Sequence, residues 1–138
     1  MRCYVVDASF CGAWVLVDES SEAADHLLAQ VETGMVGLRV PALWEYEMLN
    51  LLRSACRRGR LEEADAAAAA KALGRVTLDL VDVPDAACET RIFELAQRHE
   101  LSAYDAAYLE LALRFKLPLR TSDRALAVAA INCGVPVQ

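Results

Sequence analysis

Apolar and polar residues follow two different rhythms along this chain. Short runs rich in apolar and branched residues predict strands, and five of them occur, at residues 2–6, 36–40, 78–83, 117–121 and 135–137. Between these runs, apolar residues recur at helical spacing and predict helices at 9–17, 21–33, 41–57, 61–74, 86–99, 102–115 and 123–132. Such alternation is typical of a mostly parallel sheet with helices on both faces. The expected fold is therefore an α/β three-layer sandwich with about five strands.

The helix predicted at 102–115 contains one residue that does not fit its apolar face. At 100° per residue, one arc of this helix consists of Leu101, Tyr104, Tyr108, Leu111, Ala112 and Phe115, with Leu109 beside it. Glu110 and Arg114 are expected to point away from this arc, whereas Asp105 falls inside it. A carboxylate removed from water without a partner is costly, and it usually neutralises or finds a cation. Asp105 is therefore a candidate functional residue.

Two further aspartates follow predicted strands. Asp7 ends the first strand, and Asp123 comes just after the fourth. Open α/β sheets bind ligands beyond the carboxyl ends of their strands, which makes both residues candidates for a site. An acid at this position also commonly caps the next helix, and capping is the better explanation for either residue taken singly.

A fourth candidate acid lies in the helix predicted at 41–57, where the periodicity leaves two residues open. Glu45 and Glu47 flank the apolar stripe of this helix on opposite sides, about equally. Asn50 and Ser54 give Glu47 polar neighbours, while Glu45 has leucines on its side. Either glutamate also fits as a surface residue at the edge of the stripe.

Composition limits the class of protein. The chain has 138 residues, of which 56% are hydrophobic, so we expect one domain over residues 1–138 with a substantial core. The five cysteines are widely spaced without a CxxC pair, which predicts reduced thiols in a cytoplasmic protein. We expect no signal peptide and no membrane-spanning segment. The formal net charge of −6 disfavours a nucleic-acid partner unless a bound metal reverses the local sign.

Four motifs, in their order and spacing, resemble the PIN domain and, within it, the VapC toxins of bacterial toxin–antitoxin pairs. They are YVVDAS at the amino end, ExxN in the helix at 41–57, LSAYDAAYLELA beyond residue 100, and TSD near the carboxyl end. The resemblance spans essentially the whole chain, and the third motif is the most specific. It implies an acidic site for Mg²⁺ or Mn²⁺ formed by Asp7, Glu47, Asp105 and Asp123.

The resemblance implies an endoribonuclease, and the residue types agree with that chemistry. Hard divalent cations prefer oxygen ligands, and a bound cation can activate water for attack on a phosphodiester. No histidine accompanies a serine or threonine in the motifs, so we expect no covalent intermediate. The residues expected to support the acids through hydrogen bonds are Ser9, Asn50, Thr121 and Ser122. The nucleotide-binding patterns GxxxxGK[ST] and GxGxxG are absent.

The same resemblance implies the partners. They are an RNA substrate, such as a tRNA or ribosomal RNA, a VapB-like antitoxin that covers the site, and a second copy of the chain in a homodimer. A basic patch at the end of the helix at 41–57 is a candidate contact for RNA or antitoxin, and comprises Arg53, Arg57, Arg58 and Arg60. Complementing the helix dipole explains this patch about as well.

One residue departs from the pattern of the family, close to the candidate Asp123. Arg120 stands at a strand position that is usually apolar in the family, directly before the TSD motif. The alternative to a ribonuclease is a PIN-fold interaction module that has lost catalysis and keeps its acids as a structural cluster. The presence of all four acids at matching positions favours the enzyme.

Overall fold

A parallel sheet of four strands forms the centre of the molecule. The computed structural model describes all residues, 1–138. The strands are β1 (Arg2–Val6), β2 (Val36–Pro41), β3 (Asp79–Val81) and β4 (Leu119–Arg120). Their spatial order is β3-β2-β1-β4, and every neighbouring pair is parallel. The predicted α/β sandwich with a parallel sheet is confirmed.

The fifth predicted strand, at 135–137, is reduced to a single parallel bridge between Leu119 and Val137. Two backbone hydrogen bonds make this bridge, from Leu119 N to Pro136 O and from Gln138 N to Leu119 O. Pro136 has no N–H group with which to extend the ladder toward the start of β4. The contact therefore stops after one residue pair.

Seven helices surround the sheet: α1 (Ala8–Cys11), α2 (Glu22–Glu32), α3 (Leu43–Arg57), α4 (Glu63–Leu73), α5 (Ala86–His99), α6 (Ala103–Phe115) and α7 (Arg124–Asn132). The single helix predicted at 9–17 is wrong. It is the four-residue α1 followed by 3₁₀ turns at Gly12–Trp14 and Val17–Glu19. The Trp14 indole N–H donates to Ala24 O at 2.8 Å and so connects residues 12–14 to α2.

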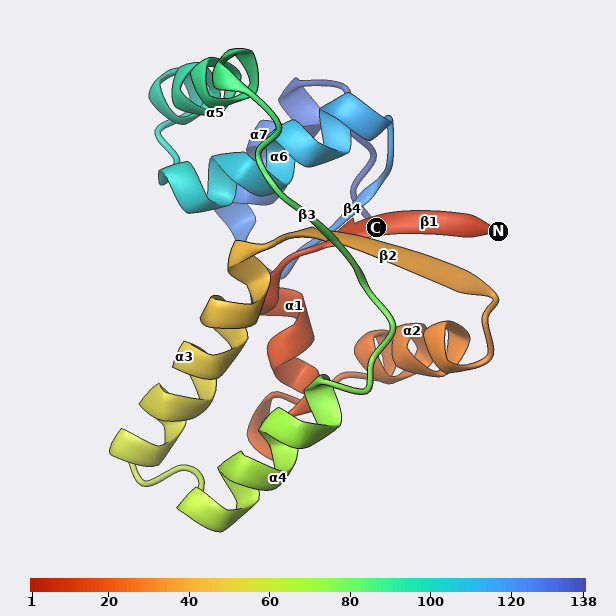
Figure 1. The fold of residues 1–138 in the computed structure, drawn as a ribbon, viewed down its shortest axis with the longest axis vertical. Helices are drawn as coiled ribbons and strands as arrows, with labels where there is room; N and C mark the ends of the chain where they lie inside the picture. The colour runs from red at the N-terminus through yellow and green to blue at the C-terminus, as the bar shows by residue number, and fades with distance from the viewer.

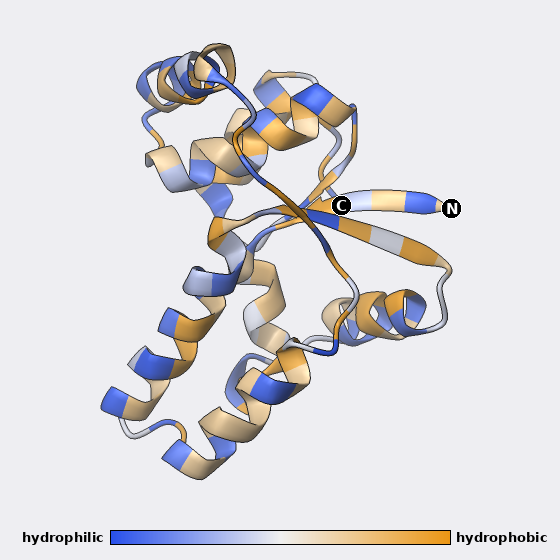
Figure 2. Cartoon of the chain, in the orientation of Figure 1, coloured by the Kyte–Doolittle hydropathy of each residue, from blue (hydrophilic) through white to orange (hydrophobic).

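The helices cover the two faces of the sheet unequally (Figure 1). Helices α5, α6 and α7 lie on one face, while α1, α2, α3 and α4 lie on the other. The α3–α4 hairpin extends away from the sheet, and its tip is hydrophilic in Figure 2. No helix is long and apolar enough to span a bilayer. All five cysteines are unpaired, as expected.

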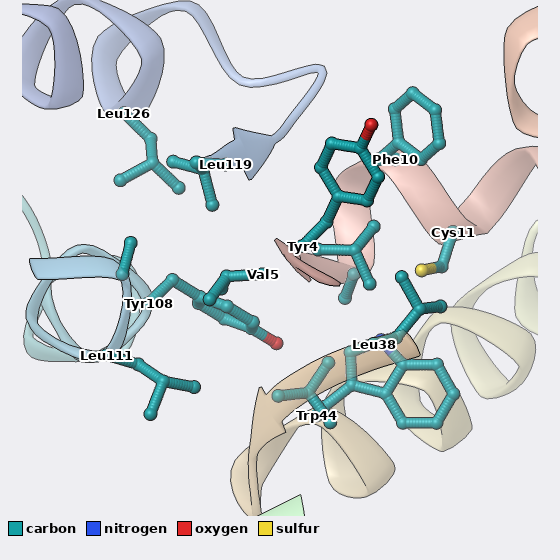
Figure 3. Packing of buried hydrophobic residues seen from close by; sticks show 14 of the residues in the cluster. Tyr4, Val5, Phe10, Cys11, Leu38, Trp44, Tyr108, Leu111, Leu119 and Leu126 are labelled. Carbon is teal, nitrogen blue, oxygen red and sulfur yellow. The ribbon is translucent and has the colours of Figure 1, made fainter. Parts of the chain in front are cut away.

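Side chains from the two faces of β1 pack into separate halves of the core (Figure 3). Val5 faces Tyr108 and Leu111 on α6, while Tyr4 faces the α1 side, where Phe10 lies. Val5 is fully buried, and Tyr4 and Tyr108 are only 2% and 1% exposed. Alternation along one strand thus anchors both helical layers to the central sheet.

Helix α6 is more deeply buried than a single apolar arc predicts. Every residue from Ala106 to Ala112 is buried, including Glu110, which is only 3% exposed. Our expectation that Glu110 points toward solvent is therefore wrong, and Tyr104, expected in the buried arc, is 66% exposed. Glu110 is buried because α6 lies between the sheet and α5, so that two sides of this helix are covered.

Two arginines compensate the buried charge of Glu110. Arg114 donates through Nε at 3.0 Å and Nη2 at 3.2 Å to the two carboxylate oxygens. Arg91 on α5 brings its Nη2 to 3.5 Å from Glu110 Oε1. Both arginines also reach solvent, so the buried Glu110 carboxylate is paired and neither arginine is fully desolvated. The cluster therefore joins α5 to α6.

We predict that Glu110→Gln lowers the free energy of unfolding by about 1 to 3 kcal/mol, because buried charge-assisted hydrogen bonds are lost. Urea unfolding followed by circular dichroism measures this change. Glu89→Gln, at an exposed position of α5, is the matched control and should stay within about 0.5 kcal/mol of the parent chain. Equal stability of the two variants would show that the Glu110 cluster does not stabilise the α5–α6 contact.

Candidate active site

The strand order β3-β2-β1-β4 places connections on both sides of β1. From β1 the chain moves to β2 and β3 on one side, whereas β4 lies on the other side of β1. The carboxyl ends of β1 and β4 are therefore neighbours at a switch point, where open α/β sheets commonly bind ligands. Asp7 follows β1 and residues 121–123 follow β4. The backbone N–H of Asp7 donates to Arg120 O at 3.1 Å and fixes the two ends together.

Asp7 is a buried carboxylate, 3% exposed, that accepts three hydrogen bonds. Its Oδ1 accepts from Ser9 Oγ at 2.8 Å and from the backbone N–H of Phe10 at 3.1 Å. Its Oδ2 accepts from Thr121 Oγ1 at 2.6 Å. Asp7 therefore caps α1 and also faces the β4 segment, so capping and membership of the site are compatible.

The segment after β4 is arranged by the same hydroxyl groups. The backbone N–H of Asp123 donates to Thr121 Oγ1 at 2.9 Å, and that of Ser122 donates to Ser9 Oγ at 3.0 Å. Asp123 Oδ1 in turn accepts from Leu126 N at 2.9 Å and caps α7. Ser9 and Thr121 thus lie where the sequence places them, beside the acids, while Ser122 contributes its backbone.

The other two acids come from the helical layers on opposite faces of the sheet. Glu47 on α3 is half-buried and accepts a 2.6 Å hydrogen bond from the Tyr108 hydroxyl, while Glu45 is exposed. Of the two glutamates that periodicity leaves open, Glu47 is therefore the one that lies partly inside the molecule. Asp105 is half-buried in the first turn of α6, where its N–H donates to Ser102 Oγ at 3.1 Å. Asn50 is exposed and makes no side-chain hydrogen bond.

Tyr108 is the residue that sequence reasoning missed. Its position in the apolar arc of α6 indicates a core residue, and the ring is indeed buried. The signal available in the sequence is that this buried position carries tyrosine rather than phenylalanine, one turn after Asp105. A buried tyrosine hydroxyl normally needs a partner, and here the partner is Glu47.

The four acids repel one another in partly desolvated surroundings. Burial raises the pKa of Asp7 despite its three hydrogen bonds, and the charge of Asp105 raises it further. Burial also raises the pKa of Glu47, against the hydrogen bond from Tyr108, with contributions from the charges of Asp105 and Asp7. Burial and the charge of Asp123 raise the pKa of Asp105. These charges therefore form one interacting group, with Asp105 coupled to the other three.

No basic side chain neutralises this acidic group. The ion pairs of the structure involve other carboxylates, namely those of Asp18, Glu19, Asp79 and Glu110. Each carboxylate oxygen can accept about two hydrogen bonds, and Glu47 Oε2 and Asp123 Oδ2 accept none. An all-oxygen donor set with spare capacity and uncompensated negative charge fits a hard divalent cation.

The side chains do not form a finished coordination sphere. No three carboxylate, thiol or imidazole groups lie close enough together to hold a metal ion as they stand. The carboxylates of Asp7 and Glu47 instead accept hydrogen bonds from the neighbouring hydroxyls of Ser9, Thr121 and Tyr108. The ligand roles of the four acids therefore stay predictions.

Comparison with known proteins identifies the family of this chain. The family model of the PIN domain matches residues 4–132. Ribonuclease VapC3 of Pyrobaculum aerophilum is 35% identical over 123 residues, which cover 89% of this chain and 91% of that protein. The chain belongs to the PIN-domain family.

Solved structures of similar fold extend the comparison. The crystal structure of PAE2754 from Pyrobaculum aerophilum has a TM-score of 0.71 at 27% identity, covering 99% of this chain and 83% of the other. The structure of VapBC2 from Rickettsia felis, bound to a DNA fragment from its promoter, contains a chain with a TM-score of 0.66 at 10% identity. That match covers 99% of this chain and 98% of the other, and it shows a shared fold.

This PIN domain accommodates Arg120 at an apolar strand position by stacking. The Arg120 guanidinium lies over the Tyr4 ring, 4.9 Å from its centroid, and 5.9 Å from that of Phe10. Aromatic faces attract a guanidinium and shield its methylene stem. The arginine therefore leaves Thr121 and Asp123 in place, although its own Nε is buried without a hydrogen-bond partner.

The basic patch of this PIN domain divides into two parts. Arg60 donates to Asp18 Oδ2 at 2.8 Å and Glu19 Oε2 at 2.7 Å, so nearby acids neutralise its charge. Arg53, Arg57 and Arg58 are exposed and form no ion pair. They lie toward the distal end of α3, and the ten helical steps from Glu47 to Arg57 span about 15 Å along the helix.

We predict that Asp105→Asn leaves the metal-free chain as stable as the parent or more stable, because it removes one of several repelling charges. The raised pKa of Asp105 means that the folded chain holds this proton more tightly than the unfolded chain. The contribution of Asp105 to stability therefore decreases as pH rises from the ordinary pKa of 3.8. Urea unfolding between pH 4 and 8, in the presence of chelator, should show the parent falling relative to the variant.

If Asp105 were instead a satisfied structural acid, the outcome would reverse. The variant would lose about 1 to 3 kcal/mol at neutral pH, as expected when a buried hydrogen-bond partner is removed. Asp79→Asn is a useful control, because Asp79 pairs with Arg39 on the exposed edge of the sheet, away from the acids.

Proposed function

We propose that this chain cleaves RNA phosphodiester bonds with a Mg²⁺ or Mn²⁺ ion held by Asp7, Glu47, Asp105 and Asp123. The observation that carries this proposal is that the Thr121 hydroxyl joins Asp7 to Asp123 at the β1–β4 switch point, and no arginine or lysine pairs with either acid. Glu47 and Asp105 are half-buried on α3 and α6 and likewise form no ion pair. When bound, the cation would supply an activated water and neutralise charge at the scissile phosphate.

The side chains around the acids support this role. Ser9 and Thr121 donate to Asp7 and fix its orientation. Because the Ser9 hydroxyl is committed to a carboxylate and has no histidine beside it, it lacks the base that a covalent nucleophile requires. His99 contacts Cys133, with its Nε2 3.2 Å from the Cys133 Sγ. The residues therefore suit direct attack by water.

A protein inhibitor and an RNA substrate are the partners we infer. The similar structure of VapBC2 from Rickettsia felis supports a VapB-like antitoxin as the partner of this chain. Tyr46 and Leu49 on α3 are 76% and 51% exposed, and exposed apolar side chains of this kind suit coverage by a protein. The unpaired arginines Arg53, Arg57 and Arg58 are the RNA contacts we propose.

The chain would act in the cytoplasm as a single PIN domain over residues 1–138 and as a homodimer. Light scattering of the purified chain, with and without co-expressed antitoxin, measures the oligomeric state. An inactive interaction module would bind the antitoxin equally well but would not cut RNA. Cleavage assays therefore separate the two functions.

We predict that cleavage requires a divalent cation. Incubation of the purified chain with total RNA, followed by mapping of new 5′ ends, should show specific cuts with Mg²⁺ and none in excess EDTA. Asp7→Asn should reduce the cleavage rate by more than about 100-fold, because it weakens both cation and water binding. Full cleavage in EDTA would exclude the proposed mechanism.

We predict that the double variant Arg57→Ala and Arg58→Ala weakens RNA binding without changing cation affinity. Removing two phosphate contacts should reduce the slope of log affinity against log salt by about 1 to 2. Arg75→Ala, which removes an exposed arginine after α4, is the matched control. Equal salt slopes for the double variant and the parent chain would instead favour the interpretation that these arginines only complement the helix dipole.

A further inference from the structure

Helix α6 presents two polar groups to the site from positions one turn apart. Residues three apart lie on neighbouring positions of one helix face, and Asp105 and Tyr108 have this spacing. Asp105 is at the half-buried start of the helix, whereas the Tyr108 ring is inserted into the core beside Val5 and Leu111. In Figure 3 the Tyr108 hydroxyl points from the α6 layer toward the side of the sheet where Trp44 of α3 lies.

The Tyr108 hydroxyl crosses between the two helical layers to reach Glu47. Its oxygen lies 2.6 Å from Glu47 Oε1, within the range of a short charge-assisted hydrogen bond. A tyrosine hydroxyl carries its proton at neutral pH, whereas an ionised carboxylate can only accept a hydrogen bond. The tyrosine is therefore the donor to the carboxylate.

This contact restrains a side chain that would otherwise be mobile. Glu47 has three rotatable side-chain bonds, stands on the half-exposed edge of α3, and pairs with no arginine or lysine. Tyr108 is the only side chain that donates a hydrogen bond to it. With Oε1 held in this way, Oε2 remains free to accept a further ligand.

We infer that Tyr108 is a positioning residue that orients the Glu47 carboxylate for the divalent cation. This inference rests on the proposed function, because it concerns the same acidic group. Helix α6 then determines the positions of two of the four carboxylates. It carries Asp105 directly, and it holds Glu47 through the hydrogen bond from Tyr108. Orienting a ligand before binding lowers the entropy cost of binding. Tyr108 therefore contributes to cation affinity as well as to core packing.

Tyr108→Phe tests this inference because it removes one oxygen and keeps the buried ring. The matched control is Tyr104→Phe, on the same helix but 66% exposed. Calorimetric titration with Mn²⁺ should show affinity reduced about 10-fold in Tyr108→Phe, in line with the loss of an outer partner of a ligand, and unchanged in Tyr104→Phe. Cleavage should need a correspondingly higher Mn²⁺ concentration, with the rate at saturation reduced less.

A double-mutant cycle tests whether Tyr108 acts through Glu47. Glu47→Ala should weaken Mn²⁺ binding, and adding Tyr108→Phe to it should cause no further loss, because the partner is already absent. Additive losses would overturn the inference, since Tyr108 would then act independently of Glu47. Circular dichroism and urea unfolding of each variant would verify that the fold is retained.

The outcomes separate this inference from the proposed function. A parent chain that binds Mn²⁺ and cleaves RNA, with Tyr108→Phe indistinguishable from both the parent and Tyr104→Phe, would overturn the positioning role and leave the ribonuclease intact. A parent chain that binds neither Mn²⁺ nor Mg²⁺ would overturn the proposed function and the inference that rests on it.

Discussion

Repulsion among four carboxylates at the carboxyl ends of β1 and β4 is the constraint on which the rest of the structure depends. Burial and like charge both disfavour ionised acids there, as the raised pKa values of Asp7, Glu47 and Asp105 indicate. The fold offsets this cost with hydroxyl donors and with helix starts. Asp105 lies in the first turn of α6 and Asp123 caps α7, where the positive ends of the helix dipoles favour negative charge.

Helix α6 connects the stability of the fold to the chemistry of the site. Its buried middle packs between the sheet and α5, and the Glu110 cluster fixes that contact with charge-assisted hydrogen bonds. The same helix carries Asp105 at its exposed start and sends Tyr108 across to α3. A displacement of α6 would therefore move two of the four acids together, which explains why one rigid helix suits this position.

The distribution of charge makes an acidic protein compatible with the polyanionic substrate that we propose. The net charge of −6 is unfavourable for RNA, and part of that charge lies in the group that a divalent cation would neutralise. The unpaired arginines lie at the other end of α3, where a phosphate backbone could be held without competing with the cation. Arg60 and Arg120 are already engaged, by acids and by aromatic rings respectively.

The sequence by itself determined the order of strands and helices, because hydrophobic periodicity and local capping are properties of neighbouring residues. It also placed Asp7 and Asp123 at strand ends, and family resemblance selected the four acids. Only the tertiary structure showed that Glu47 is half-buried while Glu45 is exposed. It also showed that Glu110 is buried, that Tyr104 is exposed and that the last predicted strand is a single bridge. Periodicity reports one buried face of a helix, whereas these outcomes depend on contacts from distant segments. Glu47 is distinguished by Tyr108, 61 residues away in sequence, and Glu110 by the packing of α5 on the outer side of α6.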